Sequence, residues 1–383
     1  MKKLAVERPV GTPANETVNA LLESEFRALG LRVDSLPLDC DVWKGGAAEL
    51  VCGENTVELN VSPYSRACVV KAVLDATSTI DELQNTDCSG KILLLTGELC
   101  REQLQPKDYP FYFPDEHRDL IALLERKAPA AIVAVTGKSE MCGMEPFNLF
   151  NDGNFLIPSA YTDAAHYESL RGYVGNAVSL TIESSIYPAQ SRQLIAKTDA
   201  SDGKKLVICA HMDSQYNTPA ALDNAAGVAS LMHAAKLLAG SGLNIEFVPF
   251  NGEEYYRASG ELAYLDYLIK SGQPSLVVNI DSPCHAGSDV AVCLFNFDDA
   301  AMSDAQAVVS AASRVGFGAE WYSGDHAMFA FSGIPCAAVS SSDIFTGGLC
   351  DTHTPRDTTD TVDTELIQAA GDFAAKLLHS FAG

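Results

Sequence analysis

Five short groups of acids and histidines lie between residues 211 and 353, and their side chains are of the types that bind divalent metal ions. In chain order the groups are His211-Met212-Asp213, Asp223-Asn224, Glu253-Glu254, Asp281 and Asp351-Thr352-His353. Imidazole and carboxylate ligands without paired cysteines suit zinc or a harder divalent ion. Five ligands, with one carboxylate shared between two ions, are what a binuclear hydrolytic centre needs. The sequence therefore predicts a two-metal site assembled from five separate segments.

Apolar runs place three of these groups at the ends of predicted strands. The runs are residues 204–210, 244–250 and 276–280, and they lead to His211, to the glutamate pair and to Asp281. Open α/β sheets present their ligands at the carboxyl ends of such buried strands. A predicted helix opens directly after Asp223, and a carboxylate at a helix start can bridge two cations. We therefore expect a doubly wound α/β fold with the groups at one edge of its sheet.

Neighbouring residues indicate how the side chains divide the work. Asp213 can accept the second imidazole N–H of His211 and fix its tautomer, so we interpret it as an orienting residue rather than a ligand. Of Glu253 and Glu254, one can bind metal while the other accepts a proton as general base. Each residue by itself is more often structural. Their joint order favours metal binding, because burying several acids without a cation is costly.

The series of motifs resembles peptidase family M28, a family of binuclear zinc aminopeptidases. The motifs that carry the resemblance are residues 211–213, 223–228, 252–254, 279–281, 324–335 and 353–358. The resemblance implies one zinc held by His211, Asp223 and Asp281, and another held by Asp223, Glu254 and His353. It also implies Glu253 as the general base and a cis peptide between Asp223 and Asn224. The implied fold is a mixed, mostly parallel sheet of the zinc-dependent exopeptidase type.

Two positions depart from the family pattern. Many members have a tyrosine before the last histidine, where its hydroxyl can stabilise an oxyanion, but this chain has Thr352. After the glutamates the chain has Tyr255-Tyr256-Arg257 in place of a glycine-containing stretch. Either tyrosine could supply the hydroxyl, and Arg257 could pair with a substrate carboxylate. The alternative is that both aromatic rings only pack.

Asp325-His326 offers one further imidazole within the resembling motifs. The ligand set is already complete without it. We therefore interpret Asp325 and His326 as residues that brace the substrate pocket, not as ligands.

The first half of the chain has a different pattern of predicted secondary structure. Short β-like runs, interrupted by one predicted helix near Leu120–Lys127, fill residues 61–188. The runs 90–95 and 130–135 are similar to a protease-associated domain, which is often inserted in this family ahead of the first metal histidine. The alternative is a generic β-rich insertion. The predicted organisation is an N-terminal part of the catalytic domain at 1–60, an inserted domain at 61–188 and the main catalytic part at 189–383.

Composition excludes several classes of protein. The chain has 383 residues and a formal net charge of −24, which argues against nucleic-acid partners and against binding to anionic membranes. Eleven cysteines without a Cys-x-x-Cys motif indicate reduced thiols and a cytoplasmic location. Glu7-Arg8-Pro9 interrupts the start before a signal-peptide core develops, and no apolar run approaches the ~18 residues of a membrane span. The oligomeric state does not follow from the sequence.

These patterns predict a metal-dependent exopeptidase that removes N-terminal residues from peptides with a free N-terminus, using a water activated by two divalent ions. One alternative is a glutaminyl-cyclase-like acyltransferase with a single zinc, although such enzymes lack an inserted domain of this kind. Another is a non-catalytic scaffold of the same fold, which only Thr352 supports. The related M20 carboxypeptidases insert their second domain after the glutamate pair, whereas here the extra sequence precedes His211.

Overall fold

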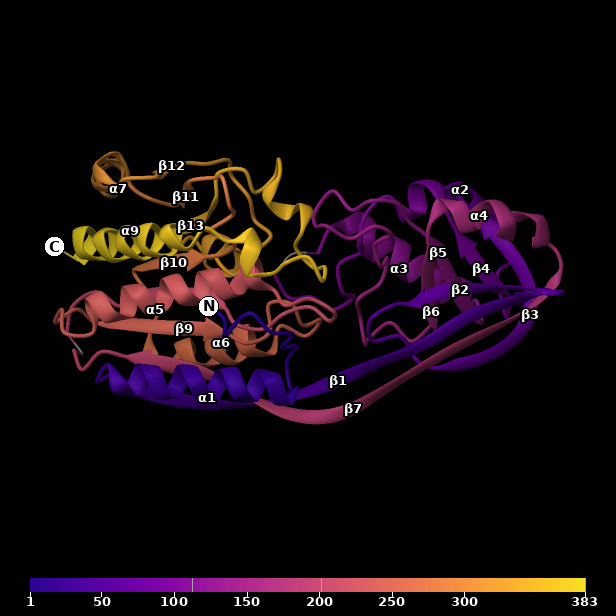
Figure 1. Ribbon diagram of the computed structural model, residues 1–383, viewed down its shortest axis with the longest axis horizontal. Helices are drawn as coiled ribbons and strands as arrows, with labels where there is room; N and C mark the ends of the chain where they lie inside the picture. Colours follow the sequence, from indigo (N-terminus) through magenta and orange to yellow (C-terminus); the bar gives the residue numbers. More distant parts are fainter. Residues whose placement is uncertain (112, 201, 383) are drawn as a thin grey trace. The chain divides into compact units, whose positions relative to one another are not determined.

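The computed structural model describes residues 1–111, 113–200 and 202–382, which form two compact units (Figure 1). Unit 1 contains Met1–Cys40 and Ala189–Gly383, and unit 2 contains Asp41–Pro188. Strands β1 (Arg32–Cys52) and β7 (Ala177–Lys197) each have residues in both units. Unit 2 therefore begins at Asp41 and not at the predicted residue 61, because the second half of β1 pairs with the next strand and buries Leu50 in the core of unit 2.

Unit 1 is built on a mixed, mostly parallel sheet. Besides the end of β7, its strands are β8 (Leu206–His211), β9 (Ile245–Phe250), β10 (Leu276–Ile280), β11 (Val290–Phe295), β12 (Val315–Phe317) and β13 (Cys336–Ser341). Their order in the sheet is β7-β9-β8-β10-β13-β11-β12. The central strands β9, β8, β10 and β13 are parallel. Strand β7 pairs antiparallel with β9 and β11 pairs antiparallel with β13, whereas β12 runs parallel to β11. The predicted α/β class with a mostly parallel sheet is confirmed.

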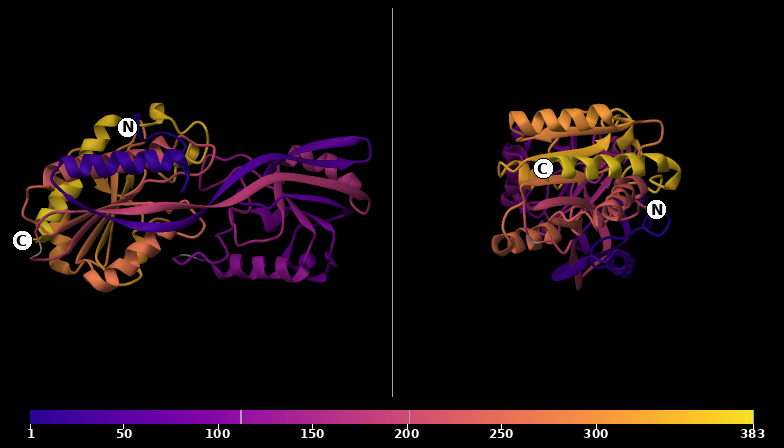
Figure 2. Two further views of the ribbon diagram at one scale, coloured as in Figure 1. Left: turned by 90° about the horizontal axis from the view of Figure 1, so that it is seen from below. Right: turned by 90° about the vertical axis from the view of Figure 1, so that its left-hand side faces the viewer.

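Helices lie on both sides of this sheet (Figure 2). They are α1 (Pro13–Ala28), α5 (Gly227–Leu238), α6 (Ser259–Ser271), α7 (Asp299–Ala311), α8 (Ala327–Ala330) and α9 (Thr364–Ala382). Phe26 of α1 stacks on Phe247 of β9 with ring centroids 6.3 Å apart, and Tyr264 of α6 meets Phe250 of the same strand at 5.4 Å. Residues three apart on a strand point to opposite faces, so α1 and α6 cover opposite sides of β9.

Local sequence signals set the bounds of α1. The Thr12 hydroxyl accepts the Asn15 N–H as an N-cap, and Pro13 occupies the first helical position, where its missing N–H costs nothing. Gly30 follows the helix with a φ of +82°, a conformation that glycine adopts without steric cost. Helix α1 is thus bounded at both ends by residues whose local chemistry favours a helix start and a helix end.

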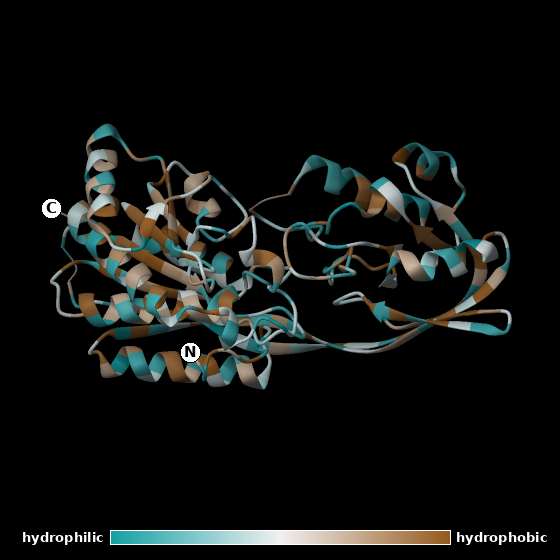
Figure 3. Cartoon of the chain, turned by 45° about the horizontal axis from the view of Figure 1, so that its top comes forward, coloured by the Kyte–Doolittle hydropathy of each residue, from teal (hydrophilic) through white to brown (hydrophobic). Residues whose placement is uncertain are grey.

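The strands of unit 2 form the other part of the same 13-stranded order, β1-β2-β6-β5-β4-β3-β7, which continues into unit 1 through β7. Its further strands and helices are β2 (Asn55–Val61), β3 (Cys68–Thr77), β4 (Ile92–Leu95), β5 (Ala131–Val135), β6 (Ser159–Thr162), α2 (Ile80–Asn85), α3 (Asp115–Lys127) and α4 (Ala164–Leu170). Short apolar strands fill its core, and they are brown in Figure 3. The helix predicted near Leu120 is α3, which ends at Ala128 in the left-handed region just before Pro129.

Among the described residues, none of the helices combines the length and the apolar character that crossing a membrane requires.

Candidate metal centre

The ends of three neighbouring strands position most of the candidate ligands. His211 is the last residue of β8, Asp281 directly follows β10, and Glu253 and Glu254 follow β9 after a two-residue turn. Because β9, β8 and β10 are parallel neighbours, their carboxyl ends meet at one edge of the sheet. The candidate residues therefore converge within unit 1, as the strand pattern predicted.

The first group of donors surrounds the imidazole of His211. Its Nε2 lies 3.0 Å from Oδ1 of Asp223 and 3.5 Å from Oδ1 of Asp281. All three side chains are buried, and one ligand atom from each falls within 4.8 Å of the other two. Two donors of one tetrahedral zinc lie ~3.4 Å apart when each is ~2.1 Å from the ion, so this spacing fits a metal ion.

The second group shares Asp223 with the first. Nε2 of His353 lies 3.1 Å from the other carboxylate oxygen of Asp223, Oδ2, and 2.8 Å from Oε1 of Glu254. The two oxygens of Asp223 therefore face two different imidazoles, one in each group. A carboxylate in this position can bridge two cations, each completed by its own histidine and its own second acid.

The orientation of Glu254 also fits a cation. Its Oε1 is buried and accepts no hydrogen bond from any described residue, although the His353 ring nitrogen is only 2.8 Å away. A ring nitrogen and a carboxylate oxygen this close together suit a shared metal ion, which accepts electron pairs from both.

The charges at the site agree with the same conclusion. Burial lowers the pKa of His211, but the charge of Glu253 and the contacts with Asp213, Asp223 and Asp281 outweigh burial and raise that pKa well above its usual value. Burial, Glu254 and Asp281 raise the pKa of Glu253 well above its usual range, with His211 opposing them. So many acids around two imidazoles make the site a strong attractor for divalent cations.

Hydrogen bonds between side chains and backbone hold the Asp223 segment in place. Asp357 accepts the N–H of Leu222 at 2.7 Å and the N–H of Asp223 at 3.1 Å. Asn224 donates to the carbonyl of Ile280 at 2.8 Å, the last residue of β10. The peptide bond between Asp223 and Asn224 is cis, as the family resemblance implies. These contacts fix the Asp223 segment against the strand that carries Asp281.

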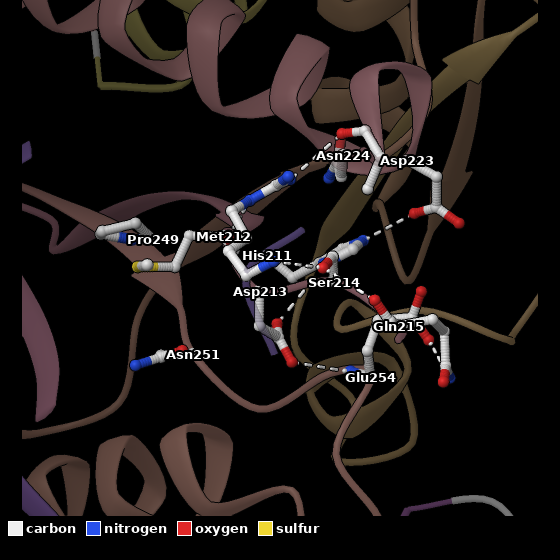
Figure 4. Close-up of polar contacts among 12 residues, drawn as sticks. His211, Met212, Asp213, Ser214, Gln215, Asp223, Asn224, Pro249, Asn251 and Glu254 are labelled. Carbon is white, nitrogen blue, oxygen red and sulfur yellow. Dashed lines mark hydrogen bonds and ion pairs between the residues drawn. The ribbon is translucent and has the colours of Figure 1, made fainter. Parts of the chain in front are cut away.

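Two polar side chains orient Glu254 and His211. Asp213 accepts the N–H of Glu254 at 3.2 Å, and its other oxygen lies 3.6 Å from Nδ1 of His211, which is longer than a normal hydrogen bond (Figure 4). Gln215 donates to Oε2 of Glu254 at 2.7 Å (Figure 4). Asp213 thus holds the Glu254 backbone and faces His211, while Gln215 fixes the carboxylate and leaves Oε1 toward His353.

The residues expected to bind substrate occupy two kinds of environment. Tyr255 and Tyr256 are both 2% exposed, and their rings meet edge to face with centroids 4.7 Å apart. The guanidinium of Arg257 lies 5.1 Å from the centroid of the Tyr256 ring, and the residue is exposed. The two rings pack against each other, and Arg257 is accessible to solvent.

The hydroxyl of Thr352 is engaged away from the metal ligands. Thr352 is fully buried and donates to the backbone carbonyl of Leu349 at 3.1 Å. The neighbouring motif residues are buried too. His326 approaches the carbonyl oxygen of Trp321 at 2.8 Å through Nε2, and Asp325 has one carboxylate oxygen that accepts no hydrogen bond from the described residues. Neither Asp325 nor His326 belongs to the two groups of candidate metal donors.

Sequence reasoning missed three residues that support the site. Asp357 lies within the last resembling motif but carried no assigned role, and Gln215 gave no signal beyond its place near His211. Arg8 counted only as an interruption of a signal-peptide core. Each acts through contacts with residues distant in the chain, which a motif does not contain.

Comparison with known proteins relates the chain to peptidases. The model of Peptidase family M28 matches residues 193–378, which include every candidate metal ligand. The probable lipoprotein aminopeptidase LpqL of Mycobacterium tuberculosis is 25% identical over 275 residues, which cover 68% of this chain and 51% of that protein. The aligned part of the chain therefore spans about half the length of this relative.

Solved structures share the fold over almost the whole chain. An aminopeptidase from Aneurinibacillus sp. strain AM-1 has a TM-score of 0.74 at 19% identity, covering 99% of this chain and 91% of that one. A zinc aminopeptidase from Bacillus subtilis has a TM-score of 0.72 at 20% identity, covering 97% and 90%. At these identities the likeness shows the common fold.

Proposed function

The segment 193–378 belongs to peptidase family M28, and on this premise we propose that the protein is a metal-dependent exopeptidase that removes N-terminal residues from peptides. The observation that carries the proposal is the pair of donor groups that share Asp223. Three donors for each ion, with one carboxylate facing both imidazoles, support a binuclear centre. The imidazole and carboxylate donors, and the name of the Bacillus subtilis relative, favour zinc.

Each side chain has a defined part in this proposal. When bound, two divalent ions polarise the scissile carbonyl and lower the pKa of a water molecule from ~16 toward ~7. Glu253, with a pKa raised by burial, accepts a proton and passes it to the leaving amine. Asp213 and Gln215 orient the ligands. The acids around the centre would attract the free α-amino group of a peptide, so the substrate class is peptides with an unblocked N-terminus.

The remaining assignments complete the proposal. Arg257 is exposed and can pair with a substrate carboxylate, and the hydroxyl of Tyr255 or Tyr256 would take the role of the tyrosine that Thr352 replaces. Replacing either tyrosine with phenylalanine tests this role, because a tyrosine that only packs would keep turnover unchanged. Asp325 and His326 would brace the substrate pocket.

The proposal extends to unit 2 and to location. Unit 2 would be a protease-associated domain that contributes no metal ligand, and a cytoplasmic location would follow from the reduced cysteines. The relative named as a lipoprotein makes location a point to test. Fractionation of cells that express the native gene would decide it, and recovery of the protein with membranes or outside the cell would contradict the cytoplasmic assignment.

Metal content per chain and substrate choice test the function together. Elemental analysis of the unmodified protein and of Glu253→Ala should give two ions each, while only the unmodified protein should hydrolyse aminoacyl amides with a free amine. Equal cleavage of free and N-blocked amides would refute the exopeptidase assignment. One ion per chain would favour the cyclase-like alternative, and no ion with no hydrolysis would favour a scaffold.

Single-ligand variants sharpen this test. Asp281 and His353 each belong to one group, so Asp281→Asn and His353→Ala should each reduce the content toward one ion per chain. Asp223 belongs to both groups, so Asp223→Asn should weaken both sites. Two fully occupied sites in the Asp223→Asn protein would show that this carboxylate does not bridge the ions.

A further inference from the structure

A buried arginine near the N-terminus contacts the backbone of the segments that carry His211 and Asp223. Arg8 is 1% exposed, and it precedes α1 by a few residues. Burying a guanidinium ion is costly unless all its donors are satisfied. Arg8 belongs to neither donor group and has no part in the proposed proton transfer, so its burial calls for another explanation.

The guanidinium of Arg8 joins two segments that carry ligands. Its Nε donates to the carbonyl of Met212 at 2.5 Å, next to His211. Its two terminal nitrogens donate to the carbonyls of Pro219 at 3.0 Å and Ala220 at 3.2 Å, a few residues before Asp223. One rigid, planar group therefore sets the separation between these two stretches of backbone.

The backbone around Arg8 extends these contacts. The Arg8 N–H donates to the hydroxyl of Ser214 at 2.8 Å, so both its backbone and its side chain hold the stretch after His211. The Arg8 carbonyl accepts from Nδ2 of Asn15 at 3.1 Å, and the same nitrogen donates to Asn251 at 2.8 Å. Asn251 follows β9 and precedes the glutamate pair. The N-terminal segment thus contacts the stretches that adjoin His211, Asp223 and Glu254, which together include ligands of both donor groups.

The charge of Arg8 also matches its surroundings. Burial lowers the pKa of Arg8 to about 10, while Asp213, Asp223, Asp357 and Glu254 oppose this shift, so the guanidinium stays charged at neutral pH. The positive charge of Arg8 in turn favours the ionised form of these carboxyl groups, which is the form that binds cations. The hydrogen bonds of the guanidinium go to backbone carbonyls, which leaves the carboxylate oxygens available to metal ions.

We propose that Arg8 is a positioning residue of the metal centre, and that its guanidinium holds the segments carrying His211 and Asp223 at the separation that two ions require. This inference rests on the proposed function, because it assumes that the two donor groups bind metal. Residues that orient metal ligands typically change metal affinity ~10–100-fold when they are replaced. Arg8 acts through the backbone of the ligand segments and touches no substrate.

The test compares divalent-ion affinity, measured by chelator competition, with stability measured on the metal-free protein. Arg8→Met removes both the charge and the N–H donors of the guanidinium group, and it should weaken zinc binding ~10-fold or more. Arg8→Lys keeps the charge but cannot span the carbonyls of Met212 and Ala220, so it should also lose affinity, though less. Added guanidinium ion should restore zinc affinity to Arg8→Met, whereas added sodium should not.

The matched control is Arg192→Met. The Arg192 side chain pairs with Glu16 and Glu23 and fastens α1 to β7. Only its backbone carbonyl, which the substitution keeps, accepts from Asn251. Its replacement should lower stability but leave zinc affinity within about twofold of the unmodified protein. Arg8 variants that keep their affinity, or that lose no more than Arg192→Met loses, would overturn the inference.

Two other outcomes are also decisive. If neither Arg8→Met nor Arg8→Lys folds, Arg8 is a residue of the fold alone and the inference is overturned. If the unmodified protein binds no divalent ion, the proposed function itself is refuted, whatever the Arg8 variants do. Loss of zinc affinity in a folded Arg8→Met protein, together with its rescue by guanidinium, would establish the positioning role.

Discussion

Gly227→Ala is expected to disturb both the fold and the metal centre, because the first turn of α5 has no room for a methyl group. A Cβ at this position would lie 2.1 Å from Oδ1 of Asn224 and 2.5 Å from the carbonyl oxygen of Ile280. The second atom is backbone and cannot rotate away. The Asn224 side chain, or the end of β10, must therefore move.

The magnitude follows from the contacts that would be strained. The Asn224 carboxamide accepts from the N–H groups of Gly227 at 2.9 Å and Ser282 at 3.1 Å, and it donates to Ile280 at 2.8 Å. Overpacking costs about 1–3 kcal/mol, and each buried hydrogen bond contributes about 1 kcal/mol. Weakening two of the three bonds brings the loss to about 3–5 kcal/mol, which corresponds to a fall in Tm of about 4–6 °C when the whole chain unfolds together.

Denaturant unfolding with a chelator present measures this loss without the contribution of bound metal. Gly240→Ala is the matched control, because nothing lies within 4 Å of a Cβ built there, and it should change stability by less than about 0.5 kcal/mol. Zinc affinity of Gly227→Ala should fall as well, since Asn224 adjoins Asp223 and Ile280 adjoins Asp281. Equal stability and zinc affinity in the two alanine variants would refute the reasoning.

Two further substitutions test contacts on the outer helices. Hydrogen bonds from Arg27 and Arg192 lower the pKa of Glu23, so its stabilisation is present above its ordinary pKa of 4.5 and is lost as the pH falls through the lowered value. Urea unfolding of Glu23→Gln should show a deficit below about 1 kcal/mol at neutral pH, and that deficit should vanish in acid. Tyr267 donates to the buried Glu246 at 2.5 Å, so thermal unfolding of Tyr267→Phe should show a loss of about 1.5 kcal/mol.

The opposite results would contradict these two predictions in different ways. A Glu23→Gln deficit that persists unchanged in acid would mean that the side chain stabilises α1 by something other than its charge. Tyr187 is 49% exposed, so Tyr187→Phe serves as the control for Tyr267→Phe. Equal stability of these two phenylalanine variants would show that the contact with Glu246 contributes nothing net.

The sequence by itself indicated the candidate ligands and the elements that carry them. Buried strands of five or six residues end at His211 and Asp281, and their apolar runs have no competing helical period. Such features depend on neighbours within a few residues, which is why their prediction needed no knowledge of the tertiary fold.

Only the tertiary structure decided how the site is held together. The contacts of Arg8 with Met212 and of Asp357 with Asp223 join residues more than a hundred positions apart, and no local pattern encodes them. The start of unit 2 at Asp41 was equally hidden, because β1 runs through the boundary without a break in its strand pattern. Motifs specify which side chains can bind a metal ion, but the packing of distant segments fixes where their oxygens and nitrogens point.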